Sequence, residues 1–286
     1  MVTCHSSNTF DKIKLLMELK EVQIFSFHYK PEPIVFNSKS YIHIWAGKNG
    51  TNTACELIGD DSGDNISAKN NYYSELTGIY WVWKNTSQDI VGSVHYRRFL
   101  TGKKEPLAYQ AKRLLYYIIG LHKKRHGLIY TKNINLFKKA ILTENEIIDL
   151  LKSYDLILPQ QRKLKYTVRT HYKRYHNQSD LDLIQSIISE KCPQYLTSLE
   201  KVLAGKRLFA NNMFIMRRAD FDRCMQWLFD LLFEFERRIK LSDYQGYQER
   251  IMGFMAERLL NVWFAHEKLK IKELPVIYFK HFKFSN

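Results

Sequence analysis

Two arginines and a histidine stand together at the end of an apolar run, where they could bind phosphate. Residues 89–96 (D-I-V-G-S-V-H-Y) predict a buried strand, and His95-Tyr96-Arg97-Arg98 closes it. Arginine forks make paired, charge-assisted hydrogen bonds to phosphate oxygens, so the group suits a diphosphate; a solvated or ion-paired arginine cluster is the alternative. Because side chains alternate along a strand, we expect His95 and Arg97 to face the ligand, and Tyr96 and Arg98 to point away.

The segment ahead of this strand predicts how the cluster is positioned. Apolar residues recur at helical spacing: Tyr72, Leu76, Ile79, Tyr80 and Trp83. The helix that they predict ends at Lys84-Asn85, where Asn85 suits a C-cap, and the strand follows directly. Open α/β sheets present ligand-binding groups at the carboxyl ends of their strands, so we expect a ligand site there.

The rest of the chain alternates between strands and helices. Strands are predicted at residues 21–27, 41–46, 155–158 and 208–216, and helices at 181–191, 194–203, 220–239 and 247–266. Thr143-Glu144-Asn145-Glu146 is a capping box that opens one more helix. This alternation indicates an α/β fold with a mixed central sheet flanked by helices and a helical C-terminal part. With no dividing linker in its 286 residues, the chain is expected to form one domain, 1–286.

Composition limits the partners and the location. Lys+Arg of 44 against Asp+Glu of 29 gives 44 − 29 = +15, which favours an anionic partner such as nucleic acid, phospholipid or a sugar nucleotide. No apolar stretch reaches the roughly 18 residues of a spanning helix, and residues 1–20 hold no apolar signal region, so a cytoplasmic protein is expected. The cysteines form no C-x-x-C pair and are expected to be reduced: Cys4, Cys55, Cys192 and Cys224.

Three ordered motifs carry a family resemblance. They are residues 63–70 (G-D-N-I-S-A-K-N), 75–85 (E-L-T-G-I-Y-W-V-W-K-N) and 91–99 (V-G-S-V-H-Y-R-R-F), and similar segments follow at 155–159, 212–216 and 253–259. Together they resemble a bacterial family of capsular polysaccharide, exopolysaccharide and O-antigen glycosyltransferases, long catalogued as a domain of unknown function. The resemblance implies a GT-A-like fold. It also implies transfer of a hexose from a nucleotide diphosphate sugar to a lipid-linked or oligosaccharide acceptor.

The sequence departs from the better-known GT-A enzymes at the end of the strand. Those enzymes carry an Asp-x-Asp metal site there, whereas this strand ends in His95-Tyr96-Arg97-Arg98. Cations of the protein could neutralise the leaving diphosphate where other enzymes use a divalent metal. We therefore predict a reaction without a metal or other cofactor. The donor sugar stays open among UDP-galactose in pyranose or furanose form, UDP-glucose and amino sugars.

The residues and the resemblance together give candidate roles. Donor-binding candidates are His28, Asp64, Asn65, Ser67, Glu75, His95, Arg97 and Arg98. Acceptor-binding candidates are Asn211, Asn212 and Arg258, and candidates for the catalytic base are Asp243, Glu249 and Glu257. A transfer that retains configuration would need no such base. Structural alternatives are a helix cap for Ser67, a helix-dipole partner for Glu75 and a surface ion pair for Glu257 and Arg258.

Residues 103–139 form a basic amphipathic insert within the domain. This segment holds ten Lys and Arg residues and Glu105 as its one acid, with apolar residues between them. Such segments lie on anionic membranes, so we expect the insert to hold the chain on the inner face of the plasma membrane. An undecaprenyl-diphosphate-linked acceptor would be found there. A helix that packs its apolar side on the core is the alternative.

Two rival functions fit the same composition. A basic nucleic-acid-binding protein would use the +15 charge and the 14% aromatic residues as a charged groove with stacking platforms. No RNP, KH or zinc-finger pattern occurs, and the aromatic residues fall on predicted apolar faces, which disfavours that function. The other rival is a non-catalytic scaffold on a membrane surface.

Overall fold

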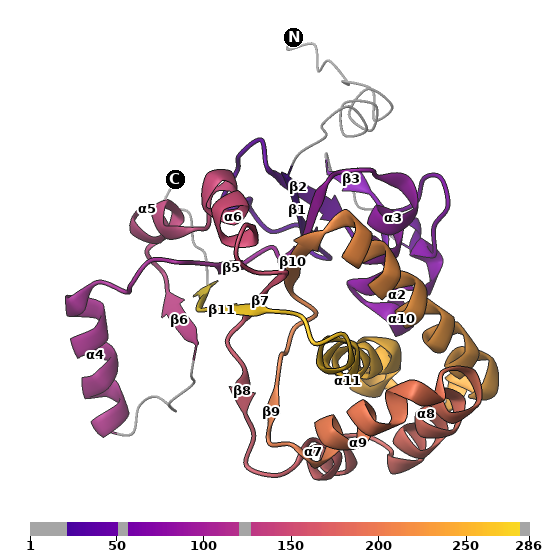
Figure 1. Cartoon of the computed structure of the whole chain (residues 1–286). Helices are drawn as coiled ribbons and strands as arrows, with labels where there is room; N and C mark the ends of the chain where they lie inside the picture. The colour runs from indigo at the N-terminus through magenta and orange to yellow at the C-terminus, as the bar shows by residue number, and fades with distance from the viewer. Residues whose placement is uncertain (1–21, 51–56, 120–126, 281–286) are drawn as a thin grey trace.

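The computed structural model describes residues 22–50, 57–119 and 127–280, and a mixed β-sheet lies at its centre (Figure 1). Within these residues the main path of the sheet has the order β11-β7-β10-β4-β1-β2-β3. Its strands are β1 (Val22–His28), β2 (Tyr41–Trp45), β3 (Ile58–Gly59), β4 (Ile90–His95), β7 (Leu156–Pro159), β10 (Phe214–Arg217) and β11 (Ile271–Leu274). Strands β1 to β4 run parallel, whereas β10 is antiparallel to β4 and β7. The predicted mixed sheet is confirmed.

Short strands extend the sheet beside β4. Strand β5 (Arg98–Leu100) folds back from β4, and β12 (Val276–Phe279) pairs with β5 and with β6 (Leu128–Thr131). A separate ribbon joins β8 (Arg162–Lys163) to β9 (Arg207–Leu208). Because β6 lies inside the predicted insert 103–139, residues 128–131 of that insert belong to the sheet.

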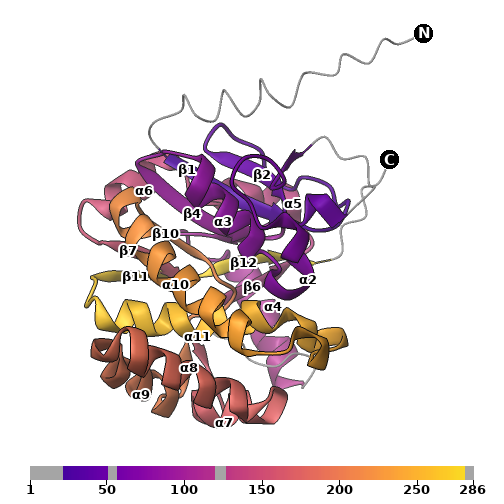
Figure 2. The ribbon, with the colours of Figure 1, turned by 90° about the vertical axis from the view of Figure 1, so that its right-hand side faces the viewer.

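The sheet separates two apolar cores, because side chains alternate along each strand. In β10, Phe214 and Met216 join one core while Ile215 joins the other. The larger core packs against α3 (Leu76–Asn85), α7 (Val168–Tyr175), α8 (Gln178–Lys191), α9 (Leu196–Ala204), α10 (Arg218–Arg238) and α11 (Ile251–His266). The smaller core packs against α5 (Ile134–Phe137) and α6 (Glu144–Leu151). Figure 2 shows α11 below the sheet, with α7, α8 and α9 beyond it.

Most predicted elements are confirmed, including the four C-terminal helices and the capping box of Thr143 and Glu146 at the start of α6. The helix predicted through residues 72–83 is broken, since α2 (Asn70–Tyr73) ends at Ser74, whose φ is 53°. The side chain of Asn70 and the hydroxyl of Thr77 both donate to the Ser74 carbonyl and hold this break. The strand predicted at 208–216 is also wrong, because a turn separates β9 from β10.

Candidate functional site

The antiparallel pairing of β4 and β10 sets the place of the site. Phe214 pairs with Ser93, so the carboxyl end of β4 meets the chain just ahead of β10. That chain is the Asn211-Asn212 turn, in which both residues have left-handed backbones, with φ of 75° and 49°. Asparagine tolerates this conformation better than most residues with a side chain. The Ser93 hydroxyl donates to the Asn212 carbonyl at 2.9 Å and joins the turn to the strand.

A hairpin places His95 beside Arg98. These two residues pair across β4 and β5, and Tyr96-Arg97 forms the turn between them. Our expectation that Arg98 points away from His95 is therefore wrong, because the chain reverses where we predicted an extended segment. Both side chains reach Asn211: His95 Nε2 lies 2.9 Å from its carbonyl oxygen, and Arg98 Nη1 donates to its Oδ1 at 3.0 Å.

The contacts of His95 fix its protonation. A carbonyl oxygen can only accept, so Nε2 carries the proton and Nδ1 keeps its lone pair. Burial lowers the pKa of His95 to about 4, although the carboxylate of Glu75 opposes this shift. His95 is therefore neutral at pH 7.

Glu75 lies beside this pair at the amino end of α3. Asn212 Nδ2 donates to its Oε1 at 2.8 Å, and the Arg250 guanidinium lies 3.4 Å from its Oε2. Burial alone would raise the pKa of Glu75, but the charge of Arg250 and the Asn212 hydrogen bond hold it below its usual value. Arg250 Nε also donates to the Ser74 hydroxyl at 2.7 Å. The start of α11 therefore lies against the break between α2 and α3.

Glu257 and Arg258 reach the same turn from α11. The Asn211 amide donates to Glu257 Oε1 at 2.7 Å, and Glu257 Oε2 lies 3.3 Å from Arg258 Nη1. Arg258 is buried and donates to the Phe254 carbonyl at 2.7 Å. Both carboxylate oxygens of Glu257 are thus engaged, which favours a role in holding the turn.

The two arginines of the hairpin keep their charge uncompensated. The Arg97 guanidinium lies 4.9 Å from the Tyr96 ring centre and 5.6 Å from that of Tyr278, and Arg98 lies 4.9 Å from Tyr278. Among the residues that the structure describes, neither arginine has a carboxylate partner in an ion pair. We name His95, Arg97 and Arg98 the hairpin cluster.

His28 lies next to the hairpin cluster at the carboxyl end of β1. Its ring centre is 5.3 Å from that of Tyr96, and its Nε2 is 2.9 Å from His43 Nδ1. His43 Nε2 faces the Phe36 carbonyl at 2.9 Å, so His43 Nδ1 accepts and His28 Nε2 donates. His28 Nδ1 is then a buried acceptor with no partner among the residues that the structure describes. Burial, followed by His43, lowers the pKa of His28 to about 3.

Three predicted donor-binding residues make hydrogen bonds near the loop ahead of α2. The buried Ser67 hydroxyl donates to Asp60 at 2.5 Å, and Asn65 Oδ1 accepts from the Ser67 amide at 3.2 Å. The exposed Asp64 accepts from the Tyr80 hydroxyl at 3.0 Å. These bonds order the loop ahead of α2, and no hydrogen bond of the described residues joins the three side chains to the hairpin cluster. Ser67 does not cap a helix as expected, since its hydroxyl is bound to Asp60.

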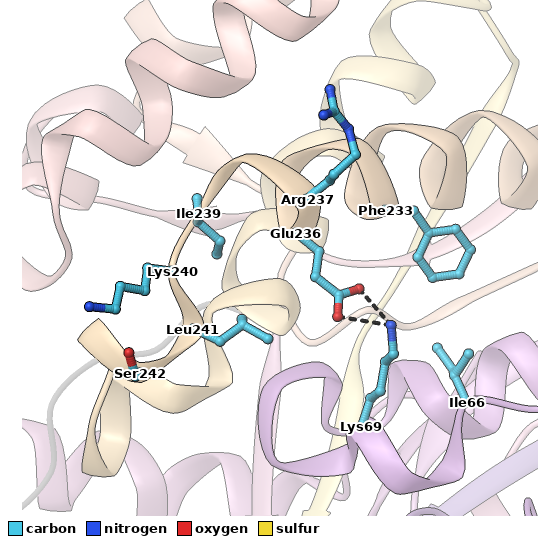
Figure 3. Close-up of a pocket in the computed structure, with 9 residues that line it drawn as sticks. All are labelled: Ile66, Lys69, Phe233, Glu236, Arg237, Ile239, Lys240, Leu241 and Ser242. Carbon is cyan, nitrogen blue, oxygen red and sulfur yellow. Dashed lines mark hydrogen bonds and ion pairs between the residues drawn. The ribbon is translucent and has the colours of Figure 1, made fainter.

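Two candidate bases make no hydrogen bond to the hairpin cluster among the residues that the structure describes. Asp243 lines an open pocket between α7, α8 and the end of α10, and Glu249 accepts from the Gly246 amide at 3.3 Å. A second open pocket lies between Lys69 and the end of α10, where Lys69 pairs with Glu236 at 2.8 Å (Figure 3). No residue of the hairpin cluster lines either pocket.

Sequence reasoning missed Ser74, Arg250 and Tyr278. Ser74 occupies a left-handed position that usually signals glycine, so the pattern held no warning of the helix break. Arg250 and Tyr278 reach the site from 175 and 180 residues along the chain from Glu75 and Arg98. Only the need of a buried carboxylate for a cation could have suggested Arg250.

The structure adds two negative findings. Within the described ranges, no three His, Cys, Asp or Glu side chains gather as a metal site would require. The prediction of a metal-independent reaction stays a prediction. In the same ranges, none of the helices combines the length and apolarity needed to span a bilayer.

Comparisons with known proteins agree with the predicted resemblance. No curated protein matches the chain. The solved apo structure of the WbbM bifunctional glycosyltransferase superposes with a TM-score of 0.80 at 29% sequence identity, over 92% of this chain and 46% of that one. The chain thus spans less than half the length of WbbM. Residues 23–268 match a family described as Domain of unknown function (DUF4422). Because that match takes in most of the chain, this protein belongs to the DUF4422 family.

Proposed function

We propose that this chain is a glycosyltransferase that moves a hexose from a nucleotide diphosphate sugar, a UDP-sugar in the first instance, to a glycan acceptor. The observation that carries the proposal is the uncompensated charge of Arg97 and Arg98 at the carboxyl end of β4. Within the described part of the chain neither guanidinium group has a carboxylate partner, so both can bind a diphosphate at little cost, because no ion pair there has to break first. The likeness to WbbM supports the same reaction class.

The chemistry requires charge to be stabilised on the leaving group. The bond between the anomeric carbon and the phosphate oxygen breaks, and the electron pair leaves with the diphosphate. The acceptor oxygen bonds to the anomeric carbon, and its proton passes to water or to the released diphosphate. Preorganised cations at the developing charge act without reorganisation, and removal of one such donor typically costs about 100- to 1,000-fold in rate. Arg97 and Arg98 would serve in this way.

Neighbouring residues would keep the arginines in place. Asn211 binds both His95 and Arg98, and Glu257 holds the amide of Asn211. We therefore infer that Glu257 is a positioning residue. Asn212 would couple the same turn to Glu75, through its 2.8 Å hydrogen bond.

We also propose a specific donor sugar and a specific acceptor. UDP-galactose, in pyranose or furanose form, is our first candidate donor. An undecaprenyl-diphosphate-linked glycan of surface polysaccharide synthesis is our first candidate acceptor, because the +15 charge suits two diphosphate substrates. Such an acceptor would place the enzyme on the inner face of the plasma membrane.

Thermal shift and donor hydrolysis test this function. Ligands that bind only the folded state raise the midpoint of unfolding, so UDP and one UDP-sugar should stabilise the protein while an oligonucleotide should not. Arg97→Gln should abolish most of that shift and lower donor hydrolysis about 100-fold. Arg174→Gln is the matched control, because Arg174 also stacks on a tyrosine, at 3.9 Å from the Tyr166 ring centre, outside the hairpin cluster. Stabilisation by the oligonucleotide alone would indicate a nucleic-acid-binding protein. No stabilisation by any of these ligands would favour a non-catalytic scaffold on a membrane surface.

A further inference from the structure

Helix α4 (Leu107–Ile118) exposes its apolar side to solvent. No residue of α4 is buried, and its large apolar residues are among the most exposed in the described chain: Leu107 is 82% exposed, Ile118 70% and Leu114 59%. At 100° per residue these three fall with Ala111 and Leu115 on one side of the helix. We name these five residues the outer stripe.

The opposite side of α4 attaches the helix to the protein. The Tyr109 ring packs edge-on against Phe137 of α5 at 5.1 Å, and Asn133 Nδ2 donates to the Tyr109 hydroxyl at 3.2 Å. Arg113 pairs with the buried side chain of Glu105 at 2.9 Å. A surface helix of a globular protein normally turns its apolar side inward. In α4 this order is reversed, which excludes the packing of its apolar side on the core.

Basic residues surround the outer stripe. Between residues 101 and 142 Glu105 is the one acid, and Arg113 neutralises it. Exposed lysines of this segment lie before, within and after α4: Lys103, Lys104, Lys112, Lys132, Lys138 and Lys139. The predicted cations Lys123, Lys124 and Arg125 lie outside the described residues. Figure 1 shows α4 at the margin of the molecule, apart from the helices α7 to α11.

We propose that α4 lies in the surface of an anionic phospholipid bilayer, with the outer stripe among the acyl chains and the lysines against the headgroups. This combination of an apolar stripe and basic flanks is the signature of helices that lie in the membrane interface. A second copy of the chain would bring like charges together, and a nucleic acid would leave the stripe in water. Membrane binding of this kind goes beyond the proposed function and does not rest on it.

Vesicle sedimentation with the full chain tests the proposal. The protein should bind vesicles of phosphatidylglycerol and phosphatidylcholine at least about tenfold more tightly than vesicles of phosphatidylcholine alone, and salt should weaken this binding. The double variant Leu114→Gln, Ile118→Gln should lose about tenfold or more in affinity for the anionic vesicles, because two apolar contacts are removed without a change of charge. Ile34→Gln with Tyr247→Gln is the control, since both residues are exposed and lie outside the insert.

Two outcomes would overturn the proposal. One is equal vesicle binding by the α4 variant and the wild type. The other is a wild-type dimer in light scattering that the α4 variant converts to a monomer, with no vesicle binding by either protein. Hydrolysis of the donor in solution should be the same for wild type and α4 variant. A failure of membrane binding therefore leaves the proposed reaction standing, and a failure of hydrolysis leaves the membrane proposal standing.

Discussion

The hairpin cluster and α4 place polar and apolar side chains in opposite positions relative to solvent. Around β4, polar side chains are drawn inward and bind one another through Asn211, Asn212 and Glu75. In α4, polar side chains hold the helix to the protein while the outer stripe faces solvent. The first region is built for chemistry that needs fixed charges, and the second for attachment to an apolar phase. Substitutions should therefore damage activity in one region and location in the other.

The largest effect should come from Arg98. Arg98→Gln removes a cation from the diphosphate site, so we expect donor turnover to fall about 100- to 1,000-fold. Its partly exposed side chain should contribute less than about 1 kcal/mol to the free energy of unfolding. Arg98→Lys keeps the charge but loses the forked guanidinium, so its donor turnover should lie between that of the wild type and that of Arg98→Gln. Steady-state kinetics measure the loss, and wild-type turnover by Arg98→Gln would remove the hairpin cluster from the mechanism.

Acid should destabilise the strand-end region through His95. Burial lowers its pKa from 6.5 to about 4, so its contribution to stability is complete above pH 6.5 and is lost as pH falls toward 4. The unfolded chain takes up the proton first. Between pH 7.5 and pH 5.0 the free energy of unfolding should fall by at most about 2 kcal/mol through His95.

Urea unfolding at the two pH values measures this contribution. His95→Gln should lose less stability than the wild type over the interval. A smaller loss should persist in the variant, because His28 and His171 also have pKa values lowered mainly by burial, to about 3 and about 4. An identical loss in both proteins would show that folding does not lower the pKa of His95.

Substitutions in the outer stripe should have the smallest effect, and that effect is on the free energy of unfolding. Leu114→Gln with Ile118→Gln exchanges side chains that already face water, so the free energy of unfolding should change by no more than about 0.5 kcal/mol. Leu259→Ala in α11 is the contrasting core variant, and its fully buried side chain should cost about 3 kcal/mol. Destabilisation of the two variants to the same extent would mean that the outer stripe is covered in the folded protein.

Local patterns predicted the framework of this molecule and missed its turns. Strands β1, β2 and β4 follow from short apolar runs, and the capping box of α6 follows from short-range hydrogen bonds; the sequence displays both directly. The breaks at Ser74, at Tyr96-Arg97 and at Asn211-Asn212 were missed, because none holds glycine or proline. The pair of asparagines inside an apolar run was a turn signal that we did not use.

The candidate site was predictable only in part, for a related reason. His95, Arg97 and Arg98 follow one another in the sequence, so their grouping was visible. Asn211, which binds His95 and Arg98, and Arg250, which pairs with Glu75, come from distant segments. Only the antiparallel pairing of β4 with β10 brings Asn211 to the hairpin cluster.

The central claim is that protein cations at the end of β4 take the place of a metal ion in stabilising the diphosphate. Turnover of a UDP-sugar in excess chelator, with and without added manganese, tests it most directly. We expect equal rates for the wild type under both conditions, and a loss of those rates in Arg97→Gln and Arg98→Gln that manganese does not restore. Activity that disappears in chelator and returns with manganese would contradict it.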